Sequence, residues 1–500
     1  MGADKMPHRF WGFFLAMPRP SSKASPASRP PMAAGPGRAK LMPLRRLSLQ
    51  HVRSIEDLNL SFECDDGTVR KWTILLGENG TGKSTVLRAI ALLLAGSEAL
   101  PELIARPESY VRNGFDDCRI AAEVVTAEGE ERNISLSLHR ADVIRQLYAR
   151  NADAMEAIDR AVGRSPRNYF TVGYGTSRRL ARGGRFDRSE EYKKPRAQSV
   201  ATLFNPDASL KPLQEWAIGL HYRSGRKGLS VVRHALKGLL PDVSFKGIDR
   251  ERAELLFDTP DGVVPLDRLS DGYQNVAAWC GDLLYRITST FKDYRDPLSA
   301  RGLLLIDEID LHLHPVWQRQ LRAYLDAKLP NFQIIATTHS PLTAQQAGPG
   351  ELFVLRRPGP GLPAVLHQFE GEPRKLMLHQ LLLTPLFGVE TVDSDKVETE
   401  RQEYERLKKK RKRSAAESRR LGELREELAD LPDWGRESPH EKRQRAALER
   451  IEKVLANVTR TNGAATAAAP GETGSSRRGA RRSRESGARR PGRRGGGLLK

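Results

Sequence analysis

The chain of 500 residues carries 82 Lys and Arg against 62 Asp and Glu, a net charge of +20, and 39% of its residues are hydrophobic. That share supports a packed core in the middle of the chain. The sequence has no run of eighteen apolar residues, so we predict no membrane-spanning helix. Three scattered cysteines, Cys64, Cys118 and Cys280, match neither a metal site nor a disulfide set and favour a reducing cytoplasm.

The excess positive charge lies at the two ends of the chain. Residues 1–42 carry a net +6, residues 401–460 a net +6 and residues 461–500 a net +8, whereas residues 43–400 hold 47 basic and 47 acidic side chains. Binding of nucleic acid through charge is therefore expected from the tails and not from the middle of the chain.

Residues 1–42 are rich in Pro, Ser and Ala, and we expect them to be disordered or a mis-assigned extension, with Met42 as a candidate start. The apolar run Phe10 to Met17 follows basic residues, as in a secretory signal. It is short and lacks a clear cleavage site, so export is not predicted. The first strand is expected to begin at Leu44.

Residues 77–84 read Gly-Glu-Asn-Gly-Thr-Gly-Lys-Ser, the G-x-x-x-x-G-K-[ST] phosphate loop. An apolar strand at 72–76 precedes it and a helical run at 85–94 follows it, which is the context that the pattern requires. In such a loop backbone N–H groups bind the phosphates of ATP, Lys83 lies on the β- and γ-phosphates, and the Ser84 hydroxyl binds Mg²⁺. The predicted contacts are Gly77, Glu78, Asn79, Gly80, Thr81, Gly82, Lys83, Ser84 and Thr85.

A long segment, 85–268, separates the phosphate loop from the next motif. Its hydrophobic pattern predicts a strand pair at 119–125 and 132–138, helices at about 141–162 and 210–239, and a second strand pair at 248–266. It has no sustained heptad repeat, so we expect a compact helical lid at about 140–247 and no long coiled-coil arm.

Eleven basic residues in the segment 160–196 face only Asp187, Glu190 and Glu191. We read this Gly- and Arg-rich stretch as a loop on the lid side. Three interpretations stay open: a solvated loop, a contact with a phosphate backbone, or a contact with nucleotide or another subunit.

A fully apolar strand, 302–306, ends in two acidic residues. Burial there would be costly without a cation. We therefore predict that Asp307 holds Mg²⁺ through water, and that Glu308 orients or deprotonates the attacking water. The alternative is a strand that merely leaves the core through an acidic loop.

Residues 401–460 are expected to form one or two exposed, highly charged helices. Residues 461–500 are rich first in Ala and then in Arg, Gly and Ser, and they cannot form a core. We expect this tail to be disordered and to bind anions without specificity.

Two further motifs complete a pattern with the phosphate loop and the acidic strand: Leu269-Ser-Asp-Gly272 and Thr337-Thr-His339. Together they make residues 43–400 resemble the ATP-binding-cassette-like ATPases of the RecF and structural-maintenance-of-chromosomes group. Within it, the chain is similar to compact predicted ATP-binding proteins of bacterial anti-phage and virulence-associated systems. The resemblance implies an α/β P-loop NTPase with an ABC-type ATPase head, a mixed β-sheet core flanked by helices, an antiparallel β subdomain and the compact lid.

The resemblance also implies roles in a homodimer. Ser270 and Gly272 of one subunit would close over ATP held by the phosphate loop of the other, and His339 would sense the γ-phosphate. By themselves, Ser-Asp-Gly is also an ordinary turn and helix cap, and a histidine at a strand end is usually structural.

The same family carries a glutamine loop where this chain has Tyr169 to Arg178. No glutamine stands there, so the corresponding Mg²⁺ contact stays unassigned. His312 and His314 have no third metal ligand nearby in the sequence, and we read 310–315 as a loop that touches the opposing subunit, with Pro315 starting a helix.

These features predict a cytoplasmic ATPase that works as an ATP-gated dimer in DNA repair or anti-phage defence, together with a separately encoded effector protein. DNA contact would come from the basic tails and the 160–196 stretch. The alternative is a nucleotide-gated regulator of a protein effector without direct DNA contact. An ATPase subunit of a transporter is disfavoured by the lid and the missing glutamine loop, and no appended nuclease is recognisable.

Overall fold

The computed structural model divides into two compact units, residues 1–389 and residues 390–500, which are described separately. The structure describes residues 44–125, 131–178, 192–237, 240, 242–292, 297–359, 361–389, 391–429 and 431. The expectations for residues 1–42 and 461–500, and the centre of the basic stretch at 179–191, lie outside these ranges.

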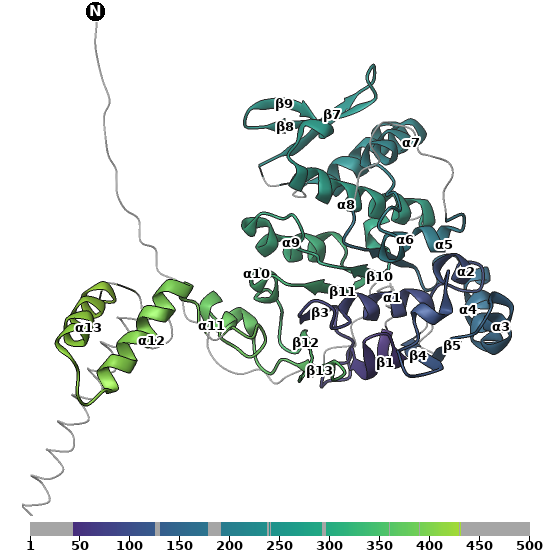
Figure 1. Ribbon diagram of the computed structural model, residues 1–500. Coiled ribbons are helices and arrows are strands. Elements are labelled where there is room, and N and C mark those ends of the chain that lie inside the picture. The colour runs from purple at the N-terminus through teal and green to yellow at the C-terminus, as the bar shows by residue number, and fades with distance from the viewer. Residues whose placement is uncertain are drawn as a thin grey trace, which may run out of the picture. The chain divides into compact units, whose positions relative to one another are not determined.

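A six-stranded sheet forms the centre of the first unit, in the order β13-β12-β3-β11-β10-β6 (Figure 1). Neighbours from β12 to β6 are parallel, and β13 is the antiparallel edge. The strands are β3 Trp72–Gly77, β6 Thr171–Tyr174, β10 Gly302–Ile306, β11 Phe332–Thr338, β12 Leu352–Arg356 and β13 Val365–Gln368. The inner strands are almost uniformly apolar because both faces of the sheet are covered.

One face of the sheet packs on helix α1 (Lys83–Leu93) and on an antiparallel sheet in the order β2-β1-β4-β5. Its strands are β1 Leu44–Val52, β2 Ile55–Ser61, β4 Asp117–Val125 and β5 Glu131–His139. Leu303 and Leu305 of β10 point into this core, which is the period of two that a strand dictates. The predicted first strand and the predicted pair β4 and β5 are confirmed.

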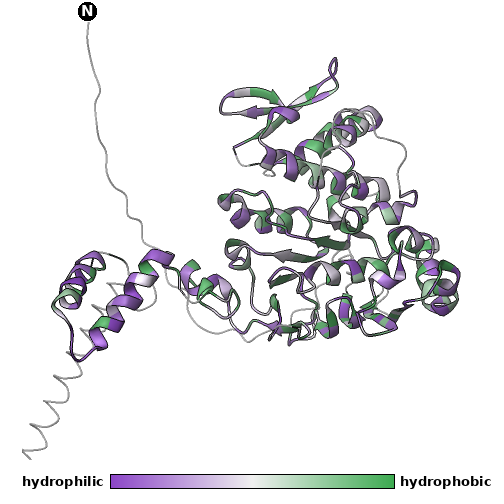
Figure 2. Cartoon of the chain, viewed as in Figure 1, coloured by the Kyte–Doolittle hydropathy of each residue, from purple (hydrophilic) through white to green (hydrophobic). Residues whose placement is uncertain are grey.

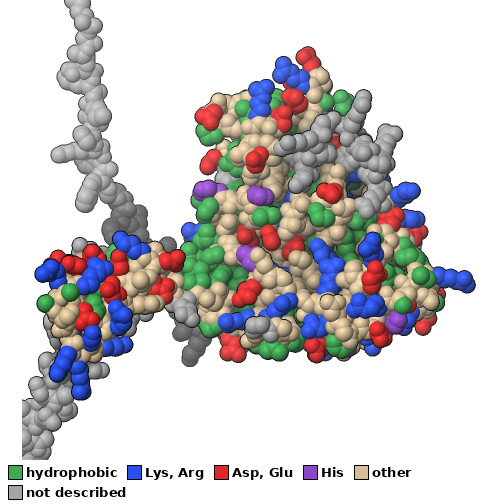
Figure 3. Space-filling view, in the orientation of Figure 1, with side chains coloured by type: hydrophobic (Ala, Val, Ile, Leu, Met, Phe, Trp, Pro, Cys, Tyr) green, Lys and Arg blue, Asp and Glu red, His purple; other side chains and the backbone are tan. Residues whose placement is uncertain are grey.

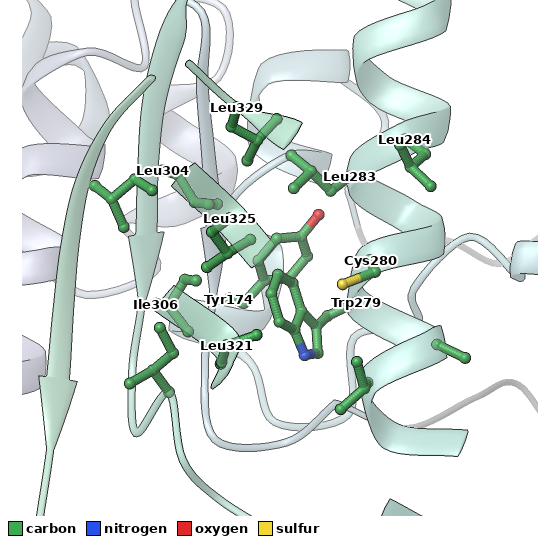
Figure 4. Packing of buried hydrophobic residues seen from close by; sticks show 14 of the residues in the cluster. Tyr174, Trp279, Cys280, Leu283, Leu284, Leu304, Ile306, Leu321, Leu325 and Leu329 are labelled. Atoms are coloured by element: carbon green, nitrogen blue, oxygen red, sulfur yellow. The ribbon is translucent and has the colours of Figure 1, made fainter. Parts of the chain in front are cut away.

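The opposite face carries helices α8 (Asp271–Thr290) and α9 (Pro315–Lys328), visible above the sheet in Figure 1. Leu304 and Ile306 of β10 point into this second core. Figure 4 shows the ring of Tyr174 beside the indole of Trp279, with ring centroids 5.7 Å apart. The other labelled members come from the sheet and from α8 and α9: Leu304, Ile306, Cys280, Leu283, Leu284, Leu321, Leu325 and Leu329.

The insertion after β5 contains helices and strands near the predicted positions, but its elements differ in detail. The expected helix at 141–162 is two helices, α3 (Ile144–Arg150) and α4 (Ala152–Arg164). Asn151 separates them because its buried amide bonds to the main chain of Ser137 in β5, at 2.7 and 2.8 Å. The expected second strand pair is a three-stranded sheet of β7 Ser244–Asp249, β8 Glu254–Thr259 and β9 Gly262–Pro265.

Helix α7 (Leu213–Leu236), predicted as one helix, reverses direction inside its span. Gly225 has φ 54° and ψ −130°, which is not helical. A Cβ on Gly228 would lie 2.2 Å from the carbonyl oxygen of Leu220. Residues eight apart in a straight helix are about 12 Å apart, so the two halves pack on each other as a hairpin.

The prediction of one continuous basic loop at 160–196 is wrong. Strand β6 lies inside this stretch and is fully buried at the edge of the central sheet. Arg178 is also buried, and Arg196 donates to the main chain of Leu94 and Asn168. A four-residue strand is too short to show a periodic pattern.

Five short helices and four 3₁₀ turns complete the first unit among the described residues. They are α2 Leu100–Leu103, α5 Pro195–Gln198, α6 Ala201–Phe204, α10 Pro341–Ala344, α11 Leu378–Leu382, and turns at Pro107–Ser109, Leu266–Arg268, Pro297–Ser299 and Pro373–Lys375. In the part of the chain that the structure describes, no helix is long and apolar enough to cross a lipid bilayer.

The second unit contains helices α12 (Asp395–Lys409) and α13 (Ala415–Glu427), so α12 crosses the domain boundary expected at residue 400. Ser414 caps α13 and pairs reciprocally with Glu417, a capping box. Both helices are largely hydrophilic in Figure 2, and their buried side chains are Leu407 and Leu424. Such helices are held by few apolar contacts, so the charged surface dominates this unit.

Candidate nucleotide site

The phosphate loop joins the end of β3 to the start of α1. Its three glycines have positive φ angles: 151° at Gly77, 75° at Gly80 and 115° at Gly82. A Cβ at Gly77 would lie 2.3 Å from the carbonyl oxygen of Leu355 in β12, so only glycine fits there. Gly82 is the N-cap of α1, which leaves the first N–H groups of the helix directed at the loop.

Lys83 lies over this loop. Its ammonium donates to the carbonyl oxygens of Gly77 at 2.8 Å and of Glu78 at 2.9 Å. Burial lowers the pKa of Lys83, and attraction by Asp307, Glu308 and Glu78 opposes that shift. The lysine of the loop is therefore within electrostatic reach of the acidic pair that follows β10.

Asp307 and Glu308 form a turn at the end of β10, at the same edge of the sheet. Because β11 lies between β3 and β10, and Thr338 pairs with Leu76, the phosphate loop and the acidic turn are one strand apart. Thr337 connects the turn to β11: its hydroxyl donates to Asp307 Oδ1 at 2.6 Å and accepts from the Glu308 N–H at 2.7 Å.

His339 follows β11 and is exposed. Burial is the largest cause that lowers its pKa, and repulsion from Lys83 adds to it, while Glu308, Asp310 and Asp307 act in the opposite direction. The imidazole therefore lies within electrostatic reach of the loop lysine and the acids. The Ser340 hydroxyl accepts from the N–H groups of Leu342 and Thr343 and so caps α10.

Ser270 and Gly272 stand at the start of α8. The helix begins at Asp271, and Ser270 is exposed. The neighbour of Gly272 is the loop after the acidic turn, since a Cβ there would lie 3.0 Å from the carbonyl oxygen of His312. Within one chain the structure therefore brings this motif to the 310–315 loop.

Of the two histidines of this loop, His314 caps a helix with its side chain. His312 adopts φ 63°, and His314 Nδ1 accepts from the Val316 N–H at 3.4 Å as the N-cap of α9, which Pro315 opens as predicted. Among the described residues, no group of three or more His, Cys, Asp or Glu side chains is arranged to hold a metal ion.

The residues expected to hold Mg²⁺ fit that ion. Ser84 lies in the first turn of α1, and the Asp307 carboxylate is 4% exposed with one oxygen held by Thr337. Both side chains offer oxygen ligands, which Mg²⁺ prefers. They fill only some of its coordination positions, so phosphate and water would take the others. At the place of the glutamine loop, after β6, the structure has the buried guanidinium of Arg178.

Sequence reasoning missed three side chains of this site. Thr337 was read only as part of a motif, although its hydroxyl bridges both acids. Asp310 accepts from the Thr338 hydroxyl, and burial raises its pKa. Arg178 gave no signal, because an arginine within a basic stretch reads as a surface residue.

Residues 73–344 match the family described as "AAA domain, putative AbiEii toxin, Type IV TA system". The chain belongs to this AAA-domain family. The match spans more than half of the sequence and includes the phosphate loop, the acidic turn and His339. It confirms the resemblance to RecF-like ATPases drawn from the motifs, together with the α/β P-loop fold.

Relatives of this AAA-domain protein carry names of the same kind. The chain is 31% identical over 313 residues to the Septu protein PtuA of Bacillus mycoides, covering 62% of this chain and 40% of the relative. It is 33% identical over 148 residues to the Retron Ec83 probable ATPase of Escherichia coli, covering 30% and 27%. It is 30% identical over 99 residues to the DNA replication and repair protein RecF of Marinomonas, covering 20% and 24%. The chain thus spans less than half the length of these relatives.

Proposed function

We propose that this protein is an ATPase that binds ATP·Mg²⁺ and hydrolyses it in an ATP-gated homodimer. The observation that carries the proposal is the assembly of Lys83, Asp307, Glu308 and His339 at one edge of the sheet, within electrostatic reach of one another. The match to an AAA-domain family supports the nucleotide.

In this proposal the phosphate loop and Lys83 bind the triphosphate, while Ser84 and Asp307 hold Mg²⁺, Asp307 through water. The ion supplies charge neutralisation to the phosphates. The bond from Thr337 to Asp307 Oδ1 fixes that carboxylate in one orientation. Lys83 already rests on loop carbonyl oxygens, so binding exchanges one set of oxygen acceptors for another.

Glu308 orients or deprotonates the attacking water. Its N–H is held by Thr337, so the carboxylate leaves a fixed backbone. His339 contributes a hydrogen bond near the γ-phosphate. Catalysis of this kind is mostly positioning and electrostatics, so turnover can be slow and controlled by a partner.

The exposure of Ser270 supports a dimer, and so does the place of Gly272, which approaches the 310–315 loop and not the phosphate loop of its own chain. We propose that they close over ATP bound to the second copy. The N-terminus of α8 would then direct its unpaired N–H groups at the γ-phosphate of that copy.

The names Septu PtuA and Retron ATPase support a role in anti-phage defence together with a separately encoded effector protein, and RecF supports a role in DNA repair. The alternative is a regulator of a protein effector without DNA contact. One observation favours it: residues 43–400 have no net charge, and the face in Figure 3 intersperses Lys and Arg with Asp and Glu.

The test is steady-state ATP hydrolysis by the full chain, with Glu308→Gln as the blank, in the presence and absence of double-stranded DNA at physiological salt. Hydrolysis that depends on Glu308 supports the ATPase. DNA stimulation that survives deletion of 461–500 places DNA on the ATPase unit, whereas its loss with the tail favours the regulator. A Glu308→Gln protein with the wild-type rate would remove Glu308 from the mechanism.

A further inference from the structure

Arg178 is a buried cation whose hydrogen bonds end on main-chain oxygens. It is 3% exposed and lies four residues after β6. Nε donates to the carbonyl oxygen of Gly175 at 3.0 Å, and Nη2 donates to the carbonyl oxygens of Asp307 and, at 2.8 Å, of Glu308. The guanidinium thus holds the backbone of the acidic turn and leaves the two carboxylates to other partners.

Burying a charged group at this place costs free energy. Burial lowers the pKa of Arg178 to about 10, although Asp307, Asp310 and Glu308 attract the cation. Replacing a whole buried ion pair by apolar side chains is often neutral for stability, but removing the cation alone leaves its acceptor oxygens without their donor and is destabilising. A test of Arg178 must therefore separate loss of stability from loss of catalysis.

The turn that Arg178 holds is itself unfavourable. Glu308 has φ 47°, a left-handed conformation that non-glycine residues seldom adopt and that costs of order 1–3 kcal/mol. Its N–H is bonded by Thr337 from β11, and its carbonyl oxygen by Arg178 from the β6 side. Since β10 lies between β11 and β6, the two neighbouring strands fix the turn from opposite sides.

The β6 side of this clamp is anchored to α8. The Asp307 N–H donates to the carbonyl oxygen of Tyr174 at 2.8 Å, and the Tyr174 hydroxyl donates to Asp282 of α8 at 2.9 Å. Asp282 is fully buried and bonded by Arg286 at 2.6 and 3.0 Å. Arg178 also lies over the ring of Trp279, with its Cζ 6.0 Å from the centroid.

We infer that Arg178 is a positioning residue: it fixes the Glu308 backbone so that the carboxylate meets the attacking water. The inference rests on the proposed hydrolysis through Glu308. It also accounts for the missing glutamine of this loop. Arg178 lies at the same place after β6 and serves the acidic turn by binding the main-chain oxygens of Asp307 and Glu308. Removing Arg178 leaves the phosphate loop and Lys83 in place, so nucleotide binding persists while the chemical step slows.

The experiment compares the full-length variants Arg178→Met and Arg178→Lys with Arg196→Met. Arg196 is the matched control because it is a partly buried arginine, also with a pKa lowered to about 10 and with main-chain carbonyl partners, but those are Leu94 and Asn168. For Arg178→Met we expect kcat to fall about 100-fold, with KM and the affinity for a fluorescent ATP analogue within about 3-fold of wild type. Arg196→Met should keep kcat within about 3-fold.

Arg178→Lys keeps the charge but loses the planar fork, so its kcat should fall about 10-fold, and it serves if Arg178→Met does not fold. A double-mutant cycle separates positioning from a general loss of structure. In a Glu308→Gln background Arg178→Met should add less than about 3-fold, because both act on one step. Equal and additive losses in the two backgrounds, or a wild-type kcat in both Arg178 variants, would overturn the inference.

Amide hydrogen exchange of a peptide spanning 304–312 gives a readout that does not depend on hydrolysis. Exchange should rise in Arg178→Met and stay unchanged in Arg196→Met, since only the first removes a bond to the turn. Unchanged exchange in Arg178→Met contradicts the positioning role. If exchange rises while Glu308→Gln retains the wild-type rate, the clamp stands and the proposed hydrolysis through Glu308 fails.

Discussion

The phosphate-loop edge and the start of α8 differ in how much of the proposed site one chain completes. At the edge, Lys83 and the acidic turn come from β3 and β10, joined through Thr337 of β11. At α8, Ser270 is exposed and Gly272 approaches the 310–315 loop of the same chain. This difference fits the proposal that one chain binds the nucleotide and that a second copy closes over it.

The largest effect should come from the edge itself. Lys83→Ala removes the charge expected on the β- and γ-phosphates, and charge-assisted bonds of that kind contribute about 1.5–3 kcal/mol each. We expect ATP affinity to fall by on the order of 100-fold or more. Equilibrium titration with a fluorescent ATP analogue measures it, and an affinity close to wild type would remove Lys83 from the binding site.

Glu308→Gln should separate binding from chemistry at the same edge. The side chain keeps its shape and loses the base, so kcat should fall about 10²- to 10⁴-fold while ATP still binds. Because ATP then persists, the variant should remain dimeric with ATP, which light scattering after size-exclusion chromatography detects. A variant that stays monomeric with bound ATP would contradict gating by ATP.

Ser270→Arg tests the other side of the comparison. ATP affinity of the isolated chain should be unchanged, whereas ATP-dependent dimerisation is lost and kcat falls by on the order of 100-fold, since a bulky cation at both composite sites blocks closure. Asp267→Arg, another exposed position before α8, is the control and should hydrolyse normally.

Mixing makes this test sharper. Ser270→Arg and Lys83→Ala chains in equal amounts form mixed dimers with one intact composite site, so the mixture should reach about a quarter of the wild-type rate. Each chain alone should be inactive. A mixture no more active than its components would mean that each site is completed within one chain.

The smallest effect should come from Thr337→Val, which keeps the shape and removes the hydroxyl that bridges Asp307 and Glu308. Leaving the Glu308 N–H without its acceptor should cost about 1–3 kcal/mol of unfolding free energy, with kcat down about 10-fold. Thr73→Val is the control, since the buried Thr73 hydroxyl has no hydrogen-bond partner in the structure and its loss should be neutral or stabilising. Equal changes in melting temperature and kcat for the two variants would contradict the bridge.

Much of the candidate site was predictable because its motifs are local. The phosphate loop is a continuous run whose glycines are dictated by backbone angles, and the acids follow directly from an apolar strand. Strands β4 and β5 were predictable for the same reason, since alternation over nine residues exceeds chance. In each case the deciding information lies within one segment.

The errors arose where distant segments decide. Asn151 interrupts a helical pattern because its amide bonds to the main chain of β5. The reversal of α7 is instead local, since Gly225 lets Gly228 pack on Leu220. The basic stretch was misread because β6 gains its burial from β10, whose paired residues come 132 positions later in the chain. Propensity and periodicity do not contain these partners.

The sequence by itself determined that this chain has a phosphate loop, an acidic strand end and the order of motifs shared with its AAA-domain family, because each is written in adjacent residues. Only the tertiary structure decided which side chains hold those motifs in place. Thr337 and Arg178 reach the acidic turn from β11 and from the β6 side, and the order of strands in a sheet is set by packing of the whole core.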